Sequence, residues 1–134
     1  MNNRYKIYPE LNFGIAKLEP GLKTFEELYG IAMEMRKDSD FPKVYYQLND
    51  LRGCTFNFDT SKISGITALI EEYKQRDNQK LGVYLIDRPI ETAYVQILFN
   101  SLKYERELCS TIEKAFDLLK LKISYKEFVN LIDI

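Results

Sequence analysis

The chain has 134 residues, of which 46% are hydrophobic and 29% charged, and this balance is typical of a single compact domain, here residues 1–134. Its 19 basic and 20 acidic side chains give a formal net charge of −1, which argues against nucleic-acid binding. No apolar run approaches the roughly 20 residues of a membrane span and no apolar leader opens the sequence, so we expect a cytoplasmic protein.

The first half of the chain predicts a hairpin, a helix and a central strand. Pro9-Glu10 is a turn signal between two apolar segments, and Thr24 with Glu27 has the spacing of a capping box. In chain order, the expected elements are a strand over Tyr5–Tyr8, a strand over Leu11–Leu18, a helix from Thr24 to about Lys37 and a strand over Val44–Leu48.

The second half alternates helices and strands. Pro89 suits the first position of a helix, and the pairs Ser110/Glu113 and Ser124/Glu127 each have capping-box spacing. The expected elements are a helix with an apolar stripe from Ile63 to Tyr73, a strand over Leu81–Ile86, a helix from Pro89, a strand over Glu105–Cys109, a helix after Ser110 and a C-terminal helical extension over residues 124–134. This order predicts an α/β fold with a single mixed or mostly parallel sheet of about five strands, four helices and the C-terminal helix.

The helix that begins at Pro89 carries more apolar surface than one buried face requires. We expect a core stripe, and outside it a second stripe of Val95, Phe99 and Leu102 at i, i+4 and i+7. The expected core stripe is Ile90, Ala93, Tyr94, Ile97 and Leu98. The second stripe is a candidate interface that needs cover from the tail helix, from a partner protein or second copy of the chain, or from a small apolar ligand.

The side-chain inventory excludes several kinds of catalytic site. The chain has no histidine, so Ser–His and Cys–His nucleophile pairs and imidazole metal sites cannot be assembled. Cys54 and Cys109 are the only cysteines and lie far apart in sequence, so we expect two buried, unreactive thiols. Any catalysis would therefore have to use carboxylates, lysines or tyrosines, and we expect no metal or cofactor.

The segment from Val44 to Gly65 resembles part of a known family. Asp50-Leu51-Arg52 closes the central strand, residues 53–58 form a loop, and Asp59-Thr60-Ser61-Lys62 opens the next helix. This pattern is similar to the STAS superfamily, the SpoIIAA-like domains of anti-sigma-factor antagonists and sulphate-transporter tails, whose run reads approximately Asp-Leu-Ser, an apolar loop, then Asp-Ser-Ser-Gly. The likeness in element order covers residues 5 to 120; Arg52, Lys62 and a loop one residue longer depart from the family pattern.

The resemblance implies a non-enzymatic regulatory or protein-interaction module. Its site would be Asp50, Arg52, Asp59, Thr60 and Ser61, with Ser61 or Thr60 as a phosphorylated switch and Arg52 as the neighbouring cation. A phosphate at a helix N-terminus is favoured by the free N–H groups there. The same residues also fit a plain helix cap, which needs no partner at all.

Two other functions fit the sequence. The SpoIIAA-like architecture is similar to that of the lipid-binding Sec14 type, which with the apolar third helix suggests a carrier of a small apolar or lipid-like ligand. Asp50 and Asp87 each end a predicted strand, and two such carboxylates on neighbouring strands could hold a divalent cation for phosphoryl chemistry.

Overall fold

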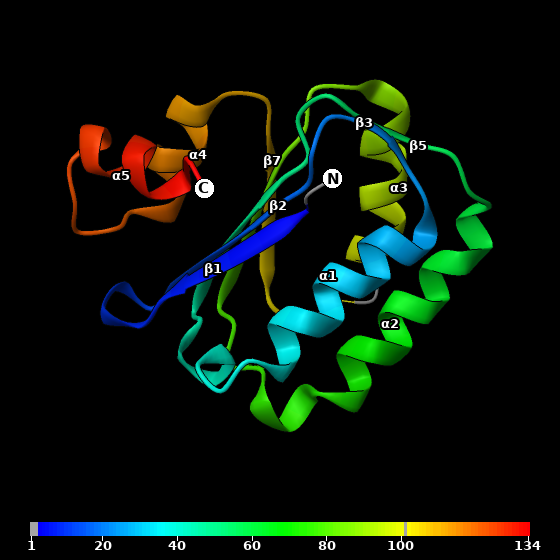
Figure 1. The fold of residues 1–134 in the computed structure, drawn as a ribbon, viewed down its shortest axis with the longest axis horizontal. Coiled ribbons are helices and arrows are strands. Elements are labelled where there is room, and N and C mark those ends of the chain that lie inside the picture. Colours follow the sequence, from blue (N-terminus) through cyan, green and yellow to red (C-terminus); the bar gives the residue numbers. More distant parts are fainter. Residues whose placement is uncertain (1–2, 101) are drawn as a thin grey trace.

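The computed structural model describes residues 3–100 and 102–134 and shows an α/β fold (Figure 1). The main sheet has the strand order β1-β2-β4-β6-β7, and every neighbouring pair is parallel except β1 with β2. Its strands are β1 Arg4–Tyr8, β2 Phe13–Lys17, β4 Tyr46–Asp50, β6 Leu81–Leu85 and β7 Glu105–Cys109. The predicted α/β class, with a mostly parallel sheet of about five strands, is confirmed.

Among the described residues, five α-helices cover the two faces of this sheet (Figure 1). They are α1 Phe25–Lys37, α2 Ile63–Glu72, α3 Pro89–Phe99, α4 Ile112–Leu119 and α5 Tyr125–Ile132. The crossovers between parallel strands step along the sheet in one direction, and such crossovers are right-handed, so α1, α2 and α3 fall on one face. The chain after β7 returns across the other face as α4 and α5. No α-helix in the described ranges is long and apolar enough to cross a membrane.

Each face of the main sheet has its own hydrophobic cluster. Ile15, Leu48 and Val83 point toward α4 and α5, where Phe128 and Ile132 of α5 are buried with them. Ala16 and Tyr84 belong to the opposite cluster, which packs under α1 and α3. The C-terminal segment is therefore a packed helix of the α4–α5 layer.

A second, two-stranded sheet lies beyond the carboxyl end of the main strands. Strands β3 (Gly21–Lys23) and β5 (Cys54–Phe56) pair in parallel, so the expectation of a continuous loop over residues 53–58 is wrong for the middle of that segment. Strands of three residues are too short for the alternation that reveals longer strands. Gly21, the first residue of β3, has φ +117°, and Gly53, immediately before β5, has φ +74°; glycine adopts both values readily.

Strand β4 begins and ends two residues later than predicted. Phe41–Lys43 forms a 3₁₀ turn, after which Val44 is buried in the core ahead of the strand. At the other end, Asn49 and Asp50 still pair with β6, opposite Tyr84 and Leu85. Polar residues therefore continue the strand, because the neighbouring strand satisfies their backbone groups.

The predicted helix caps are confirmed in two places and displaced in one. Thr24 accepts a hydrogen bond from the Glu27 N–H at the start of α1, and Ser124 with Glu127 forms a complete capping box on α5. The cap of α4 is Thr111, which accepts from the Lys114 N–H at 3.1 Å, and not Ser110. The Thr111 hydroxyl, one residue later than predicted, accepts a hydrogen bond from one of the backbone N–H groups that the first turn of α4 leaves unpaired.

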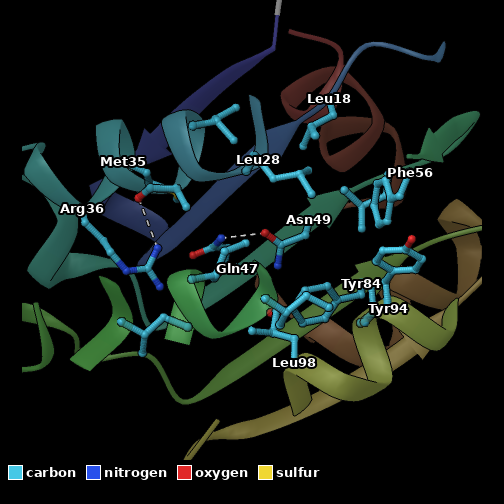
Figure 2. Close-up of a pocket in the computed structure, with 18 of the residues that line it drawn as sticks. Leu18, Leu28, Met35, Arg36, Gln47, Asn49, Phe56, Tyr84, Tyr94 and Leu98 are labelled. Carbon is cyan, nitrogen blue, oxygen red and sulfur yellow. Dashed lines mark hydrogen bonds between the residues drawn. The ribbon is translucent and has the colours of Figure 1, made fainter. Parts of the chain in front are cut away.

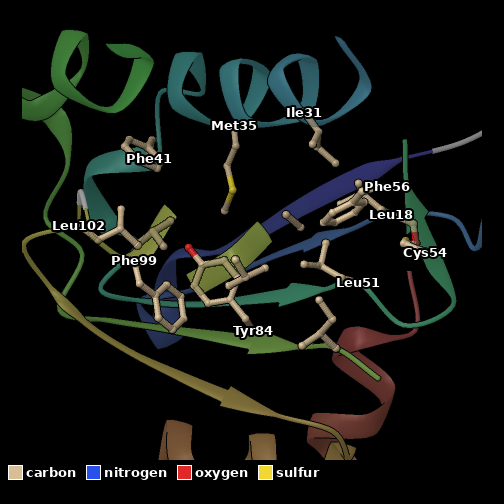
Figure 3. Packing of buried hydrophobic residues seen from close by; sticks show 14 residues of the cluster. Leu18, Ile31, Met35, Phe41, Leu51, Cys54, Phe56, Tyr84, Phe99 and Leu102 are labelled. Atoms are coloured by element: carbon tan, nitrogen blue, oxygen red, sulfur yellow. Dashed lines mark hydrogen bonds between the residues drawn. The ribbon is translucent and has the colours of Figure 1, made fainter. Parts of the chain in front are cut away.

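Helix α3 is rotated relative to the prediction, although Tyr94 and Leu98 of the expected core stripe do pack against the core. Val95, Phe99 and Leu102 are buried against the chain's own sheet, where the Phe99 ring lies 5.1 Å from that of Tyr84 (Figure 3). They belong to the core on the α1–α3 face of the sheet, so the expectation of a second stripe outside the core is wrong, and the tail helix, which packs on the other face, does not cover them. Of the expected core stripe, Ile90 and Ile97 are instead 66% and 42% exposed.

Glu91 explains this rotation. Its carboxylate is buried and accepts a hydrogen bond from the Phe56 backbone N–H at 3.0 Å, which satisfies an edge donor of β5. Residues 91, 95 and 99 share one helix face, so drawing Glu91 inward buries Val95 and Phe99 with it. The apolar pattern alone carries no trace of this buried acid.

Candidate functional site

Asp50 and Arg52 lie at the carboxyl end of β4 and bind each other. The Arg52 side chain donates to both carboxylate oxygens, from Nε at 2.9 Å and from Nη2 at 2.7 Å, and its backbone N–H donates at 3.2 Å. These hydrogen bonds raise the pKa of Arg52, and Asp50 is only 2% exposed. Since both oxygens of a buried carboxylate are satisfied within the chain, the pair fixes the turn around Leu51.

Asp87 follows β6, the strand beside β4, so Asp50 and Asp87 do end neighbouring strands as predicted. Its Oδ1 accepts a hydrogen bond from the Gly53 N–H at 3.1 Å. Each carboxylate is thus bound by a protein donor. Within residues 3–100 and 102–134, no three His, Cys, Asp or Glu side chains gather as a metal ion would require.

Asp59, Thr60 and Ser61 form the polar turn before α2. Asp59 accepts a hydrogen bond from the Ser61 N–H at 2.9 Å and thereby caps the 3₁₀ turn Thr60–Lys62 that leads into the helix. That bond is the main reason why the pKa of Asp59 is lowered. Thr60 and Ser61 are exposed, while Arg52 is bound to Asp50. The capping interpretation is confirmed for Asp59.

A cavity of about 110 Å³ lies between α2 and the main sheet (Figure 2). Helix α2 packs mainly against its neighbours α1 and α3 and forms the outer roof of this layer. Ile63, Ile66 and Ile70, at helical spacing on α2, line the cavity from above. The apolar stripe predicted for α2 therefore faces an open space as well as the core.

Aromatic side chains close the end of the cavity near the carboxyl ends of the strands. Phe56, Phe58 and Tyr94 lie with ring centroids 5.1 to 5.9 Å apart, and the Tyr94 hydroxyl donates to the Phe58 carbonyl at 2.6 Å. Leu51, held by the Asp50–Arg52 pair, also lines this end. Asp50 and Arg52, which were predicted as site residues, thus hold Leu51 in the wall of the cavity.

Two amide side chains form the floor of the cavity. Gln47 and Asn49 stand on the helix-facing side of β4, the central strand of the sheet. Gln47 is 7% exposed, and its Nε2 donates to Asn49 Oδ1 at 2.8 Å. Its Oε1 is buried and accepts no hydrogen bond within the described part of the chain. Leaving such an acceptor unsatisfied is costly.

Arg36 from the last turns of α1 reaches the same floor. It is 5% exposed, its Nη1 donates to the Ala32 carbonyl at 3.2 Å, and its guanidinium lies over the Phe41 ring. Its Nη2 is 4.0 Å from a carboxylate oxygen of Asp77. The Nε atom is buried and donates to no group among the described residues. Figure 2 shows the Gln47 oxygen turned toward Arg36.

Two phenols lie near this polar end. Tyr84 and Tyr104 both line the cavity and are hydrogen-bonded to each other. Burial raises the pKa of Tyr84 and raises that of Tyr104 well above its ordinary value. Both side chains are therefore neutral over the physiological pH range and add no charge to the cavity.

A second, more polar hollow of about 260 Å³ adjoins the cavity. The two share Ile70 and Tyr104 as lining residues, so these side chains separate them. Asp77, the charge partner of Arg36, and Gln79, whose two side-chain polar atoms are buried without a partner in the described chain, line the hollow. A molecule that enters the cavity from this side passes Ile70 and Tyr104.

Sequence reasoning placed the site at the loop and missed the cavity. The available signal was the alternation in Tyr46-Gln47-Leu48-Asn49-Asp50, which puts two amides on one face of a strand in the middle of a parallel sheet. Both faces of such strands are normally apolar. Polar side chains on one face of a central parallel strand therefore indicate either a buried hydrogen-bond network or a bound ligand.

Comparison with protein-family models, with curated proteins and with solved structures gives no match. The STAS resemblance therefore stays a prediction.

Proposed function

We propose that this protein binds a small, mainly apolar molecule in the cavity beneath α2 without transforming it. The observation that carries the proposal is the cavity itself, a space of about 110 Å³ with apolar walls and, on its floor, the buried Gln47 Oε1, which has no hydrogen-bond partner among the described residues. A pocket lined mostly by apolar groups with a few fixed polar atoms is the usual form of a small-molecule site.

The cavity volume limits the enclosed part of the ligand to about one unsubstituted ring or a short alkyl chain. An engineered apolar cavity of roughly 150 Å³ takes up benzene. This favours the ligand-carrier interpretation in a narrower form, with a small molecule in place of a whole lipid.

A second candidate is the regulatory module implied by the resemblance. One observation favours it: Thr60 and Ser61 are exposed immediately before α2, the helix that roofs the cavity. A negative charge added at Thr60 or Ser61 would shift α2. Because α2 also covers the cavity, the regulatory proposal and the ligand-binding proposal both depend on the position of this helix.

Toluene, which has no polar group, tests the ligand-binding proposal. A ligand that binds only the folded state raises the melting temperature Tm, so we expect toluene to raise the Tm of the wild-type protein. Ala32→Leu fills space in the cavity and should abolish the rise, whereas Ala68→Leu, at an exposed position of α2, should preserve it. The proposal fails if toluene leaves the wild-type Tm unchanged, or if both variants respond like the wild type.

A further inference from the structure

We propose that the ligand carries one uncharged hydrogen-bond acceptor, such as a carbonyl oxygen, which accepts a hydrogen bond from Asn49 Nδ2 on the floor of the cavity. This inference rests on the proposed function and specifies the chemistry that the cavity selects. Its basis is a polar side chain on the covered face of the central strand, partly exposed and with a donor that has no partner among the described residues.

The first step concerns the place where Asn49 is exposed. Its neighbours along β4, Leu48 and Asp50, are buried, whereas Asn49 keeps part of its surface open. In the sheet it lies between Ala16 of β2 and Tyr84 of β6, and both of these residues line the cavity with it. Helices α1, α2 and α3 cover this face of the sheet (Figure 1). The open surface of Asn49 therefore faces the cavity.

The second step concerns the orientation of the Asn49 amide. Gln47 Nε2 donates to Asn49 Oδ1 at 2.8 Å, so the Asn49 oxygen is occupied and its nitrogen lies on the other side of the amide. The neighbouring cation supports this orientation. The Gln47 oxygen is turned toward the guanidinium of Arg36 (Figure 2), and an oxygen is favoured over an NH₂ group beside a positive charge. With both amides reversed, the NH₂ group of Gln47 would face the cation.

The third step concerns the free donor. Asn49 Nδ2 donates to no group within residues 3–100 and 102–134. Figure 2 shows this nitrogen turned away from Gln47, toward Tyr84 and Leu98 of the cavity lining. An amide NH₂ group only donates, so its complement in a ligand is an acceptor. The remaining walls are apolar, with Ile63 and Ile66 above, and they suit an apolar body that carries this one polar atom.

The fourth step concerns charge. Arg36 is a charged residue of the cavity lining, and Asp77 balances it with a carboxylate oxygen 4.0 Å from Nη2. Burial keeps the phenols of Tyr84 and Tyr104 neutral. A charged ligand group would therefore enter a mostly apolar space without a counter-ion of its own. An uncharged acceptor avoids that cost.

Two probes of the same shape test the inference: cyclopentanone, and methylenecyclopentane, in which a CH₂ group replaces the carbonyl oxygen. The readout is the assigned side-chain NH₂ signal of Asn49 in an NMR titration of the wild-type protein. We expect cyclopentanone to move its protons downfield, as a hydrogen bond to an oxygen does. Methylenecyclopentane offers no acceptor and should bind without a downfield shift.

Asn49→Leu removes the donor and keeps the branched shape of the side chain. We expect it to weaken the binding of cyclopentanone about fivefold, the contribution of one net hydrogen bond, while the dissociation constant of methylenecyclopentane changes less than twofold. Asn130→Leu, at an exposed position of α5 on the opposite face of the sheet, is the matched control and should leave both constants unchanged. If Asn49→Leu is poorly folded because Gln47 loses its acceptor, the wild-type titration still decides.

The outcomes separate this inference from the proposed function. Binding of methylenecyclopentane without a downfield shift of the Asn49 signal by cyclopentanone overturns the acceptor and leaves the cavity as a binding site; a water molecule held by Asn49, or a reversed amide pair, would give this result. Cyclobutanecarboxylate, a charged probe, should bind at least about tenfold more weakly than cyclopentanone at neutral pH, and a smaller difference overturns the restriction to uncharged groups. If none of the three probes binds, the proposed function itself fails.

Discussion

Arg52 binds the carboxylate of Asp50 through two hydrogen bonds of 2.7 and 2.9 Å, and the residue between them, Leu51, lines the cavity. Arg52→Ala leaves a buried carboxylate without its guanidinium. We expect a loss of about 1–3 kcal/mol in the free energy of unfolding, measured by urea denaturation. Lys43→Ala removes the exposed pair with Asp40 and should cost no more than about 0.5 kcal/mol. Equal effects of the two variants would show that the Asp50–Arg52 pair is not structural.

Ala32→Leu should stabilise the protein, apart from its effect on ligand binding. The added methyl groups enter the cavity, where burial of apolar surface is worth about 0.8 kcal/mol per group, offset in part by imperfect fit. We expect a net gain of about 1 kcal/mol in urea denaturation. Ala68→Leu, on the exposed side of α2, should stay within about 0.5 kcal/mol of the wild type. A destabilised Ala32→Leu would mean that no such space exists in solution.

The cap of α2 predicts a contribution to acid sensitivity. Asp59 has a lowered pKa, chiefly because it accepts a hydrogen bond from the Ser61 N–H, so the folded state holds this carboxylate ionised more strongly than the unfolded state. The resulting stability is present above the unfolded pKa of about 3.9 and is lost as the pH falls through the folded value. Asp59→Asn keeps a capping oxygen without the charge. Its Tm should therefore fall less steeply than that of the wild type below about pH 4; parallel Tm curves would contradict this assignment.

The regulatory proposal predicts that charge before α2 reaches the cavity. Ser61→Asp or Thr60→Asp should change the dissociation constant of toluene at least threefold, because α2 forms the roof. Ser110→Asp, at an exposed position after β7, serves as the control and should have no effect. Unchanged stability and unchanged toluene binding in both variants would remove the switch from the account.

Both thiols should be inert in the folded protein. Burial raises the pKa of Cys54 to about 11 and also raises that of Cys109, so the reactive thiolate is scarce at neutral pH. We expect neither cysteine to react with a maleimide at pH 7.5 until the protein is denatured, when both should react. A Ser110→Cys variant provides an exposed thiol for comparison. Rapid labelling of native Cys54 would contradict its burial.

The sequence predicts the fold here better than the site, for identifiable reasons. Long periodic segments such as α1 and the apolar strand β6 reveal themselves, as do caps such as Ser124 with Glu127. The rotation of α3 depends on Glu91, whose buried contact with the Phe56 N–H joins residues 35 positions apart. Long-range hydrogen bonds of this kind leave no local pattern.

The candidate site illustrates the same limit. Asp50, Arg52 and Asp59 were identified from the chain, but their partners show that they fix turns and a cap. The cavity arises because α2 packs on α1 and α3 above a strand that carries Gln47 and Asn49. The distance between α2 and the sheet is a property of the assembled fold. In the sequence, only the alternation that places Gln47 and Asn49 on one face of β4 indicates the cavity.

The most direct test is a methyl NMR titration of isoleucine-labelled protein with toluene. Four labelled side chains line the cavity: Ile31, Ile63, Ile66 and Ile70. Five others belong to the cluster on the opposite face of the sheet: Ile15, Ile112, Ile123, Ile132 and Ile134. The account predicts saturable shifts confined to the first group, with the second group unchanged. Shifts in the second group alone, or none in either, would contradict a binding cavity beneath α2.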